Sequence, residues 1–227
     1  MGSKKVIVAL DTSNFDKTIK LVKILKDEVY AFKIGYEFFF NFGLIGYKKV
    51  YSICPKIFLD LKLHDIPNTV KKGLRALIKI KPILTTIHIS GGDEMMQSTK
   101  FEKKLTKVLG VSILTSMNNE QTNKYYNEKK ISYLVKKFAK AAKQNRLDGV
   151  VCSPQEIKHI RKTVGKKFII VTPGIRIDKN IKNDDQERIE TPKKAISMGA
   201  NYLVIGRPIT KSKHPLKILK EINNSLI

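Results

Sequence analysis

The sequence predicts an α/β protein with a single (β/α)8 barrel domain, the TIM barrel, over residues 1–227. Eight short apolar runs rich in β-branched residues alternate with eight stretches whose apolar residues recur at helical spacing. The runs are nearly continuous, as expected where helices cover both faces of a parallel sheet. The length of 227 residues is typical of such a barrel, and no linker interrupts the chain.

The first four strand–helix units are predicted from apolar runs, each followed by apolar residues at helical spacing. Residues 6–10 are continuously apolar, and Ile19, Val22 and Leu25 then recur at helical spacing. The predicted strands of this half are residues 6–10, 30–35, 56–63 and 83–90, and the predicted helices are residues 14–28, 36–51, 67–80 and 93–107. Pro67 favours a helix start, because proline lacks the N–H that a first helical residue leaves unpaired.

The last four units have shorter strands. The predicted strands are residues 109–115, 149–152, 168–172 and 202–205, and the predicted helices are residues 131–145, a helix from Pro154, residues 191–198 and a helix from Pro215. A polar loop is expected between the fifth strand and its helix. Residues 175–189 form the one long irregular stretch, and their place after the seventh strand favours a lid over the barrel mouth.

The composition excludes several classes of protein. No run approaches the ~18 apolar residues that a membrane-spanning helix needs, and no signal peptide is visible. We therefore expect a soluble protein with no membrane partner. Cys54 and Cys152 are too few for a disulfide framework or a zinc site, and they lack the flanking Cys/His pattern of the latter. Reduced thiols and a cytoplasmic location are therefore expected.

The net charge of +24 raises the question of nucleic-acid binding. Only six of the 44 basic residues are Arg, the preferred reader of bases, and Lys is spread through every segment. Lysine-rich solvated helix faces explain this pattern better than a binding stripe, so we expect no nucleic-acid partner. The positive field still favours an anionic substrate.

The candidate active site centres on the third strand and its exit. Asp60 and Lys62 interrupt the apolar run 57–63, and the period of two places both side chains on one face. Asp65 follows directly. Polar residues at the carboxyl ends of barrel strands are typical of active sites in this fold. A structural ion pair is the alternative, and the third ionisable group makes it a weaker explanation.

Other predicted strand ends add polar groups to the same mouth. These positions hold Asp11, Lys33, His88, Thr115, Gly206 and Arg207. The loops after strands seven and eight commonly bind phosphate in this fold, where Gly206 permits close backbone approach and Arg207 offers a bidentate fork. Gln186, in the predicted lid, is placed to close over the same phosphate.

The four histidines are not expected to bind a metal. No two of them have the spacing of metal ligands, and no carboxylate–histidine cluster is evident, so the predicted metal site is none. His88, at a strand end, is expected to be a hydrogen-bonded structural group more than a catalytic one. His64 faces away from Asp60 and Lys62 by strand parity, and His159 and His214 are expected at the surface.

Taken together, these motifs resemble the orotidine 5′-phosphate decarboxylase family, most of all its bacterial single-function branch. The matching segments are Asp60-Leu-Lys62-Leu-His-Asp65-Ile-Pro-Asn-Thr69, Val-Ala-Leu-Asp11, Phe-Lys33-Ile-Gly, His88-Ile-Ser-Gly-Gly, Leu-Thr115-Ser116-Met, Val-Thr-Pro-Gly-Ile-Arg176, Asp185-Gln186 and Ile-Gly206-Arg207-Pro-Ile. The resemblance implies decarboxylation of orotidine 5′-phosphate to UMP and CO2, the last step of UMP synthesis, without a cofactor. It also implies a homodimer in which Asp65 and Thr69 complete the site of the other subunit.

The resemblance also assigns roles by position. It implies that Lys62 protonates C6, that Asp60 lies beside the substrate carboxylate, and that Lys33 joins their charge network. The substrate-binding positions implied by it are Asp11 and Lys33 at the ribose, Thr115 and Ser116 at the pyrimidine amide edge, Gln186, Gly206 and Arg207 at the phosphate, and Ile66, Thr69 and Arg176 elsewhere on the substrate.

Two other functions remain open at this point. A magnesium-dependent sugar-phosphate decarboxylase or aldolase of the same superfamily also carries an Asp-x-Lys-x-x-Asp strand. The continuation at 66–69, the Thr115-Ser116 pair and Asp185-Gln186 favour orotidine 5′-phosphate over that alternative. A basic nucleic-acid-binding module rests on charge alone and leaves the charged barrel mouth unexplained.

Overall fold

The computed structural model describes residues 4–100, 105–176 and 189–226. Its eight parallel strands form a closed barrel in sequence order, with β1 beside β8. The strands are β1 (Val6–Ala9), β2 (Ala31–Ile34), β3 (Ile57–Leu63), β4 (Leu84–His88), β5 (Lys107–Val111), β6 (Gly149–Val151), β7 (Ile169–Thr172) and β8 (Tyr202–Ile205). The predicted (β/α)8 barrel is confirmed.

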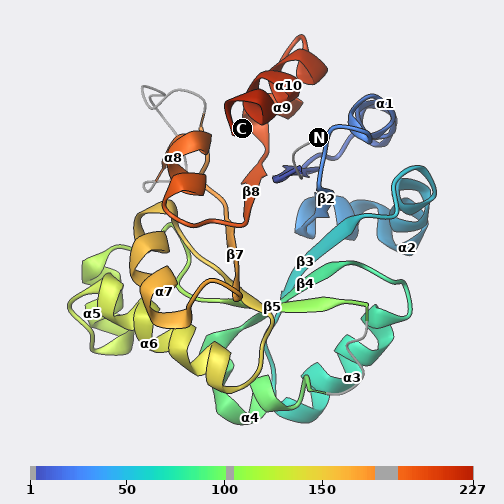
Figure 1. Cartoon of the computed structure of the whole chain (residues 1–227). Coiled ribbons are helices and arrows are strands. Elements are labelled where there is room, and N and C mark those ends of the chain that lie inside the picture. Colours follow the sequence, from blue (N-terminus) through green and yellow to red (C-terminus); the bar gives the residue numbers. More distant parts are fainter. Residues whose placement is uncertain (1–3, 101–104, 177–188, 227) are drawn as a thin grey trace.

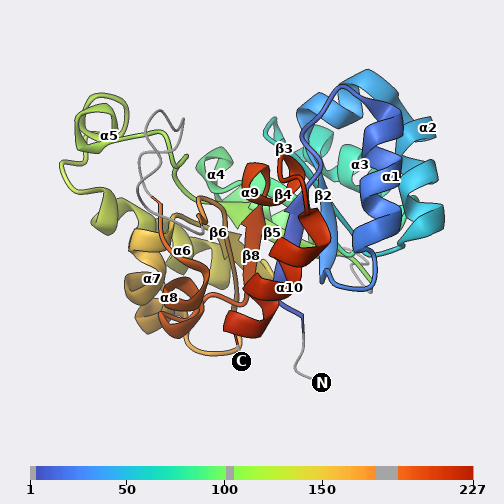
Figure 2. The same cartoon turned by 90° about the horizontal axis from the view of Figure 1, so that it is seen from above.

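Helices surround the barrel (Figure 1). They are α1 (Phe15–Leu25), α2 (Tyr36–Ile53), α3 (Pro67–Ile78), α4 (Gly92–Gln97), α5 (Asn119–Tyr126), α6 (Ile131–Gln144), α7 (Ile157–Val164), α8 (Pro192–Ser197), α9 (Arg207–Thr210) and α10 (Pro215–Ser225), with 3-10 turns η1 (Ile89–Gly91) and η2 (Pro154–Glu156). In Figure 2, α1 to α3 lie on one side of the strands and α6 to α8 on the other. None of the helices in the described ranges has the length and apolar character needed to cross a bilayer.

The barrel has two apolar layers. One fills the space between strands and helices, and its largest buried side chains include Phe32, Phe38 and Leu74. The other lies inside the barrel, where eight buried side chains meet: Ile7, Ala9, Ala31, Phe58, Leu84, Leu109, Val171 and Val204. Because every strand packs on both faces, the strands read as continuous apolar runs.

The fifth unit differs from its prediction. The predicted strand 109–115 is observed at Lys107–Val111, because β6 has only three residues and Val111 pairs with the last of them, Val151. The helix predicted over 93–107 ends at Gln97, the last residue of α4. The hydroxyls of Ser98 and Thr99 donate to carbonyls of that final turn, which favours termination there.

Two short helices lie where none was predicted. Helix α5 occupies the predicted polar loop, begins with Asn118 as its N-cap and ends at Asn127 in a left-handed conformation. Helix α9 follows β8 directly. The predicted lid at 175–189 falls mainly on residues 177–188, which lie outside the described ranges, while Ile175 and Glu190 on either side form an isolated parallel bridge.

Helix α2 is broken in the middle. Gly43 has φ 54° and ψ −148°, a conformation that side chains with a β-carbon avoid, and the helical path bends there. Large apolar side chains on this helix are left exposed, including Phe40 at 76% and Ile45 at 83%. Such a patch is typical of a surface that another protein covers.

Candidate functional site

Strand β3 carries a close ion pair at its carboxyl end. The Lys62 ammonium lies 2.9 Å from Asp60 Oδ2, and the Asp60 residue is only 8% exposed. Both side chains line one cavity, as the period of two predicts. Phe58, two residues earlier on the same face, belongs to the apolar barrel interior. The ion pair therefore sits on top of that apolar layer.

Lys62 has an uncommon backbone conformation. Its φ is +45°, in the left-handed region, and the register between β3 and β4 shifts between Leu59 and Leu63. A residue with a β-carbon in this region carries strain on the order of 1–3 kcal/mol, and such strain is often found at functional sites. The surrounding contacts must therefore hold the residue in place.

A second lysine extends the ion pair into an alternating row of charges. Lys33, in β2, lies 3.0 Å from Asp11 Oδ1 and 3.9 Å from Asp60 Oδ2. Each ammonium thus faces a carboxylate, which offsets the desolvation of the two most buried members, Lys33 and Asp60. The absence of a side chain at Gly35 leaves room for this pair, because a β-carbon there would lie 2.8 Å from Lys33 Nζ and 3.2 Å from Asp11 Oδ1.

This network is also contacted by two residues that were not predicted from the sequence, Thr86 and Tyr36. The hydroxyl of Thr86, in β4, donates to Asp60 Oδ1 at 2.8 Å and accepts the Lys62 N–H at 2.9 Å. Tyr36, the first residue of α2, donates its hydroxyl to the Leu61 carbonyl at 3.1 Å, and its ring centroid lies 5.3 Å from Lys62 Nζ. Burial, and then the Asp60 charge, raise the pKa of Tyr36.

The signals for these two residues were weak. Thr86 lies in an otherwise apolar strand, where a threonine is ordinary. Tyr36 opens an aromatic-rich helix in which four phenylalanines follow within six residues. Neither position carries a motif that distinguishes it from packing.

The cavity at the barrel mouth has a volume of about 630 Å³. It brings together eight of the predicted site residues: Asp11, Lys33, Asp60, Lys62, Thr115, Arg176, Gly206 and Arg207. Arg176 is 6% exposed and donates from Nη1 to the Ile175 carbonyl at 3.0 Å. Cationic groups lie at the β7–β8 side of this cavity and the alternating charges at the β1–β3 side. The opening therefore suits an elongated anion.

Five predicted residues are not among those lining the cavity. Gln186 lies outside the described ranges. Ser116 is exposed beyond the end of β5, and Ile66 and Thr69 are exposed at the start of α3. Asp65 is exposed, and its Oδ1 accepts the Ile66 N–H at 2.7 Å. Within the described residues Asp65 forms no ion pair with Lys62 of its own chain.

The two histidines of this region stack on each other. The rings of His64 and His88 have centroids 4.9 Å apart, and neither ring lines the cavity. Burial, followed by the neighbouring His64 and Lys62, lowers the pKa of His88 to about 4. His88 is therefore neutral near pH 7. In the described part of the chain no group of three or more His, Cys, Asp or Glu is placed to hold a metal ion.

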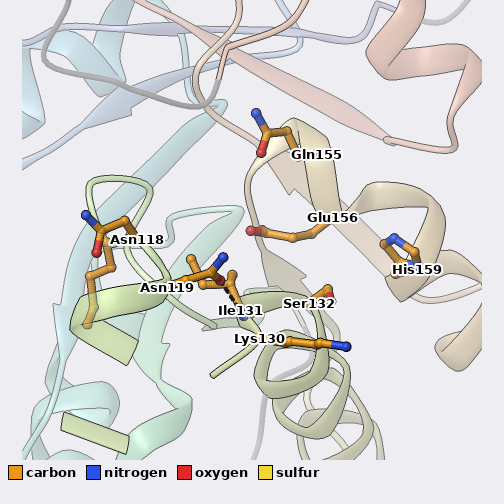
Figure 3. A pocket seen from close by; sticks show the side chains of 9 residues that line it. Asn118, Asn119, Lys130, Ile131, Ser132, Gln155, Glu156 and His159 are labelled. Atoms are coloured by element: carbon orange, nitrogen blue, oxygen red, sulfur yellow. Dashed lines mark hydrogen bonds between the residues drawn. The ribbon is translucent and has the colours of Figure 1, made fainter. Parts of the chain in front are cut away.

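A second cavity, of about 400 Å³, lies outside the barrel among α5, α6 and η2 (Figure 3). Its polar groups serve as helix caps. Asn119 Oδ1 accepts the Ile131 N–H at 3.1 Å, and Glu156 Oε2 accepts the Ser153 N–H at 2.9 Å. Since these groups are engaged in local structure, this cavity offers no charge cluster comparable to the barrel mouth.

Comparison with known proteins gives concordant results. The sequence profile of the orotidine 5′-phosphate decarboxylase / HUMPS family matches residues 4–222. An orotidine 5′-phosphate decarboxylase of Wolbachia sp. subsp. Brugia malayi is 43% identical over 223 residues, covering 97% of this chain and 98% of the relative. One from Carboxydothermus hydrogenoformans is 45% identical over 215 residues, with 91% and 89% covered. The crystal structure of the Lactobacillus acidophilus orotidine 5′-phosphate decarboxylase superposes with a TM-score of 0.85 at 36% identity, covering 99% of both chains.

Proposed function

The chain belongs to the orotidine 5′-phosphate decarboxylase / HUMPS family, and we propose that its barrel mouth performs a decarboxylation through Lys33, Asp60, Lys62 and Asp65. The protein is a carboxy-lyase that converts orotidine 5′-phosphate to UMP and CO2, the last step of UMP synthesis. The observation that carries the assignment to this site is the Lys62 ammonium held 2.9 Å from the buried Asp60 carboxylate. One domain over residues 1–227 provides the whole barrel.

The chemistry requires electrostatic stabilisation. When CO2 leaves C6, the electron pair of the broken C–C bond stays on an sp2 carbon that has no adjacent carbonyl to delocalise it. The Lys62 ammonium stabilises this charge and transfers its proton to C6, and solvent returns a proton to the amine. Enzymes lower barriers by ~8–23 kcal/mol, and a reaction with so little intrinsic assistance lies near the top of that range.

The charge row keeps the proton donor ready. Asp60 and Asp65 hold the Lys62 ammonium charged and oriented, and Lys33 balances the Asp60 carboxylate from the other side, 3.9 Å away. Because the ammonium both stabilises the carbanion and protonates it, the reaction needs no cofactor and no metal ion. Repulsion between Asp60 and the substrate carboxylate adds to the driving force.

Substrate groups remote from C6 supply binding energy. Asp11 and Lys33 bind the ribose, Thr115 and Ser116 face the amide edge of the pyrimidine, and Gln186, Gly206 and Arg207 bind the phosphate. Arg176, Ile66 and Thr69 complete the substrate-binding surface. Energy gained at the phosphate, far from the reacting carbon, helps to assemble the site.

The active enzyme is a cytoplasmic homodimer whose two sites each include Asp65 from the other subunit. Two features support this. Asp65 is exposed and unpaired with Lys62 of its own chain within the described residues. Large apolar side chains in α2 and just before α3 are strongly exposed: Tyr36, Phe40, Leu44, Ile45 and Ile66. Exposed apolar side chains of this kind are typical of a surface that a second copy of the chain covers in a two-fold dimer.

Mixing two inactive variants tests the shared site. Lys62→Ala and Asp65→Ala are each expected to be nearly inactive alone. Unfolding and refolding them together at equal amounts should restore roughly a quarter of the wild-type activity, because half of the dimers then contain one intact site of two. If the mixture stays inactive while sedimentation shows dimers, Asp65 does not act across the interface.

The reaction itself is tested by following the ultraviolet absorbance of orotidine 5′-phosphate after addition of purified protein, with and without EDTA. Equal rates under both conditions, with UMP as the product, are expected. No conversion by folded protein, together with magnesium-dependent turnover of a sugar phosphate, would favour the aldolase-like alternative. DNA retention at low salt by an inactive preparation would favour the nucleic-acid alternative instead.

A further inference from the structure

We propose that Thr86 is a positioning residue of the decarboxylase, a role that rests on the function proposed above. Its side chain is fully buried in β4, at 0% exposure, and is not among the residues that line the cavity. It acts through the two residues at the centre of the site, because one hydroxyl joins the backbone of Lys62 to the carboxylate of Asp60.

The position of Thr86 in the barrel explains how it reaches both. Leu84, two residues earlier in β4, belongs to the apolar interior of the barrel, so Thr86 faces the same interior one layer higher. Asp60 stands in the matching layer of β3, above Phe58. The hydroxyl is therefore directed at the neighbouring strand, where it contacts two residues that line the active-site cavity.

The hydrogen bonds of Thr86 have defined directions. A hydroxyl has one proton to donate, and Thr86 donates it to Asp60 Oδ1 at 2.8 Å while its oxygen accepts the Lys62 N–H at 2.9 Å. With Oδ1 engaged, the carboxylate turns its Oδ2 to the lysines, at 2.9 Å from Lys62 Nζ and 3.9 Å from Lys33 Nζ. The hydroxyl thus sets the rotation of the Asp60 carboxylate.

The same hydroxyl compensates for a break in the sheet. The β3–β4 register shifts between Leu59 and Leu63, and Lys62 has a φ of +45°. In that conformation the Lys62 N–H donates to the Thr86 hydroxyl at 2.9 Å. Without the hydroxyl, this N–H and Asp60 Oδ1 each lose a hydrogen bond. Both ends of the Lys62 ion pair would then shift.

The consequence for catalysis is specific. A misplacement of about 1 Å in a reacting group lowers turnover on the order of 100-fold, whereas phosphate and ribose contacts are unaffected. Loss of the hydroxyl should therefore lower kcat much more than the affinity for UMP. A threonine with only a structural role would alter stability without lowering kcat more than the affinity for UMP.

Thr85 provides a matched control. It is the adjacent residue, it is also 0% exposed, and its hydroxyl donates to the Leu59 carbonyl at 2.9 Å. Thr85→Val removes a buried hydroxyl and one hydrogen bond from the same strand, but none of the contacts to Asp60 or Lys62. The comparison of Thr85→Val with Thr86→Val isolates the effect on the charge row.

The experiment measures kcat, the inhibition constant of UMP and the melting temperature for both valine variants and for Thr86→Ser. We expect Thr86→Val to lower kcat about 10- to 100-fold with a UMP inhibition constant within about threefold of wild type. Thr86→Ser should recover most of kcat, and Thr85→Val should keep it. Equal kcat for the two valine variants would overturn the proposal.

A second pair of variants applies if Thr86→Val does not fold. Thr86→Ser and Thr86→Ala both lack the methyl group and differ only in the hydroxyl, so a kcat lower in the alanine variant supports the proposal and equal values overturn it. Exchange of the UMP C6 hydrogen in D2O, followed by NMR, should slow in the same order. A wild-type protein without any decarboxylation would refute the proposed function, whereas active wild type with indifferent Thr86 variants refutes only this role.

Discussion

The two ends of the barrel interior are built from the same strands but hold opposite kinds of side chain. At the end where the strands begin, the rings of Tyr30 and Tyr202 stack with centroids 3.8 Å apart over a layer of buried apolar residues. At the other end, Lys33, Asp60 and Lys62 form a row of alternating charges. In β3 the change takes two residues, from a buried Phe to a buried Asp.

This difference separates stability from chemistry. The apolar end stabilises the fold through buried area and close packing. The charged end holds desolvated groups and a strained backbone at Lys62, so it contributes little to the free energy of unfolding while it orients the proton donor. Substitutions at the two ends should therefore affect different measurements.

The largest expected effect is that of Lys62→Ala on turnover. Removing both the stabilising ammonium and the proton donor should lower kcat by about 10⁴-fold or more. The melting temperature should stay within a few degrees of wild type, because Lys62 is partly exposed and the alanine variant adds no backbone strain. Retention of near-normal turnover would contradict the assignment of chemistry to this end.

The counterpart at the apolar end is Leu109→Ala. Leu109 is fully buried in the interior layer and does not line the cavity. The cavity left behind should lower the free energy of unfolding by about 2–5 kcal/mol, as measured by urea denaturation. Specific activity per folded molecule should be unchanged below the transition. A loss of kcat comparable to that of a charge-row variant would mean that the two ends are coupled.

The dependence of stability on pH tests the surroundings of His88, at the charged end of the barrel. The pKa of His88 falls from 6.5 to about 4 on folding, so the unfolded chain binds more protons between these values. Stability should consequently decrease as the pH is lowered through this window, by about 1–2 kcal/mol after allowance for the partial exposure of the ring.

The variant His88→Gln should flatten that part of the stability profile, measured by thermal melting between pH 7 and pH 4. His159→Gln, which changes an exposed histidine on α7, is the matched control and should keep the wild-type slope. Identical slopes for all three proteins would show that His88 does not carry the pH dependence.

The smallest expected effect is that of Tyr30→Phe at the apolar end. Burial and a hydrogen bond with the Tyr202 side chain raise the pKa of Tyr30. The variant keeps the stacked ring and loses the hydroxyl, so the free energy of unfolding should fall by about 0.5–1.5 kcal/mol with kcat unchanged. Thermal melting at pH 7 measures this shift. A larger loss of unfolding free energy would mean that the hydrogen bond between the two hydroxyls, and not the ring stacking, is the main stabilising contact at this end.

The sequence was most informative where a pattern spans many residues. The eight apolar runs predicted the barrel, and the parity of 57–63 placed Asp60 and Lys62 together in the cavity. The fifth unit was misplaced because its strand length depends on the three-residue β6 beside it, a property of the pairing and not of the segment.

The parts that escaped prediction depend on contacts between distant segments. Thr86 is significant only because the β3–β4 register shifts beside it, and Tyr36 because α2 starts next to Lys62. Neither relation leaves a local trace in the order of residues. Asp65 is a different case, since its exposure is visible but its proposed neighbour, Lys62, would belong to a second copy of the chain.

Gly35 shows how an amino acid without a functional group can be constrained by activity. A β-carbon there would meet the end of a flexible Lys33 side chain, which can move aside, so Gly35→Ala should leave the fold intact. The displaced atom is, however, the ammonium that balances Asp60. In a saturation library, a screen for soluble expression would accept many residues at position 35, while complementation of a pyrimidine auxotroph would return mainly glycine. The two screens would assign this one position to opposite classes, tolerant and invariant.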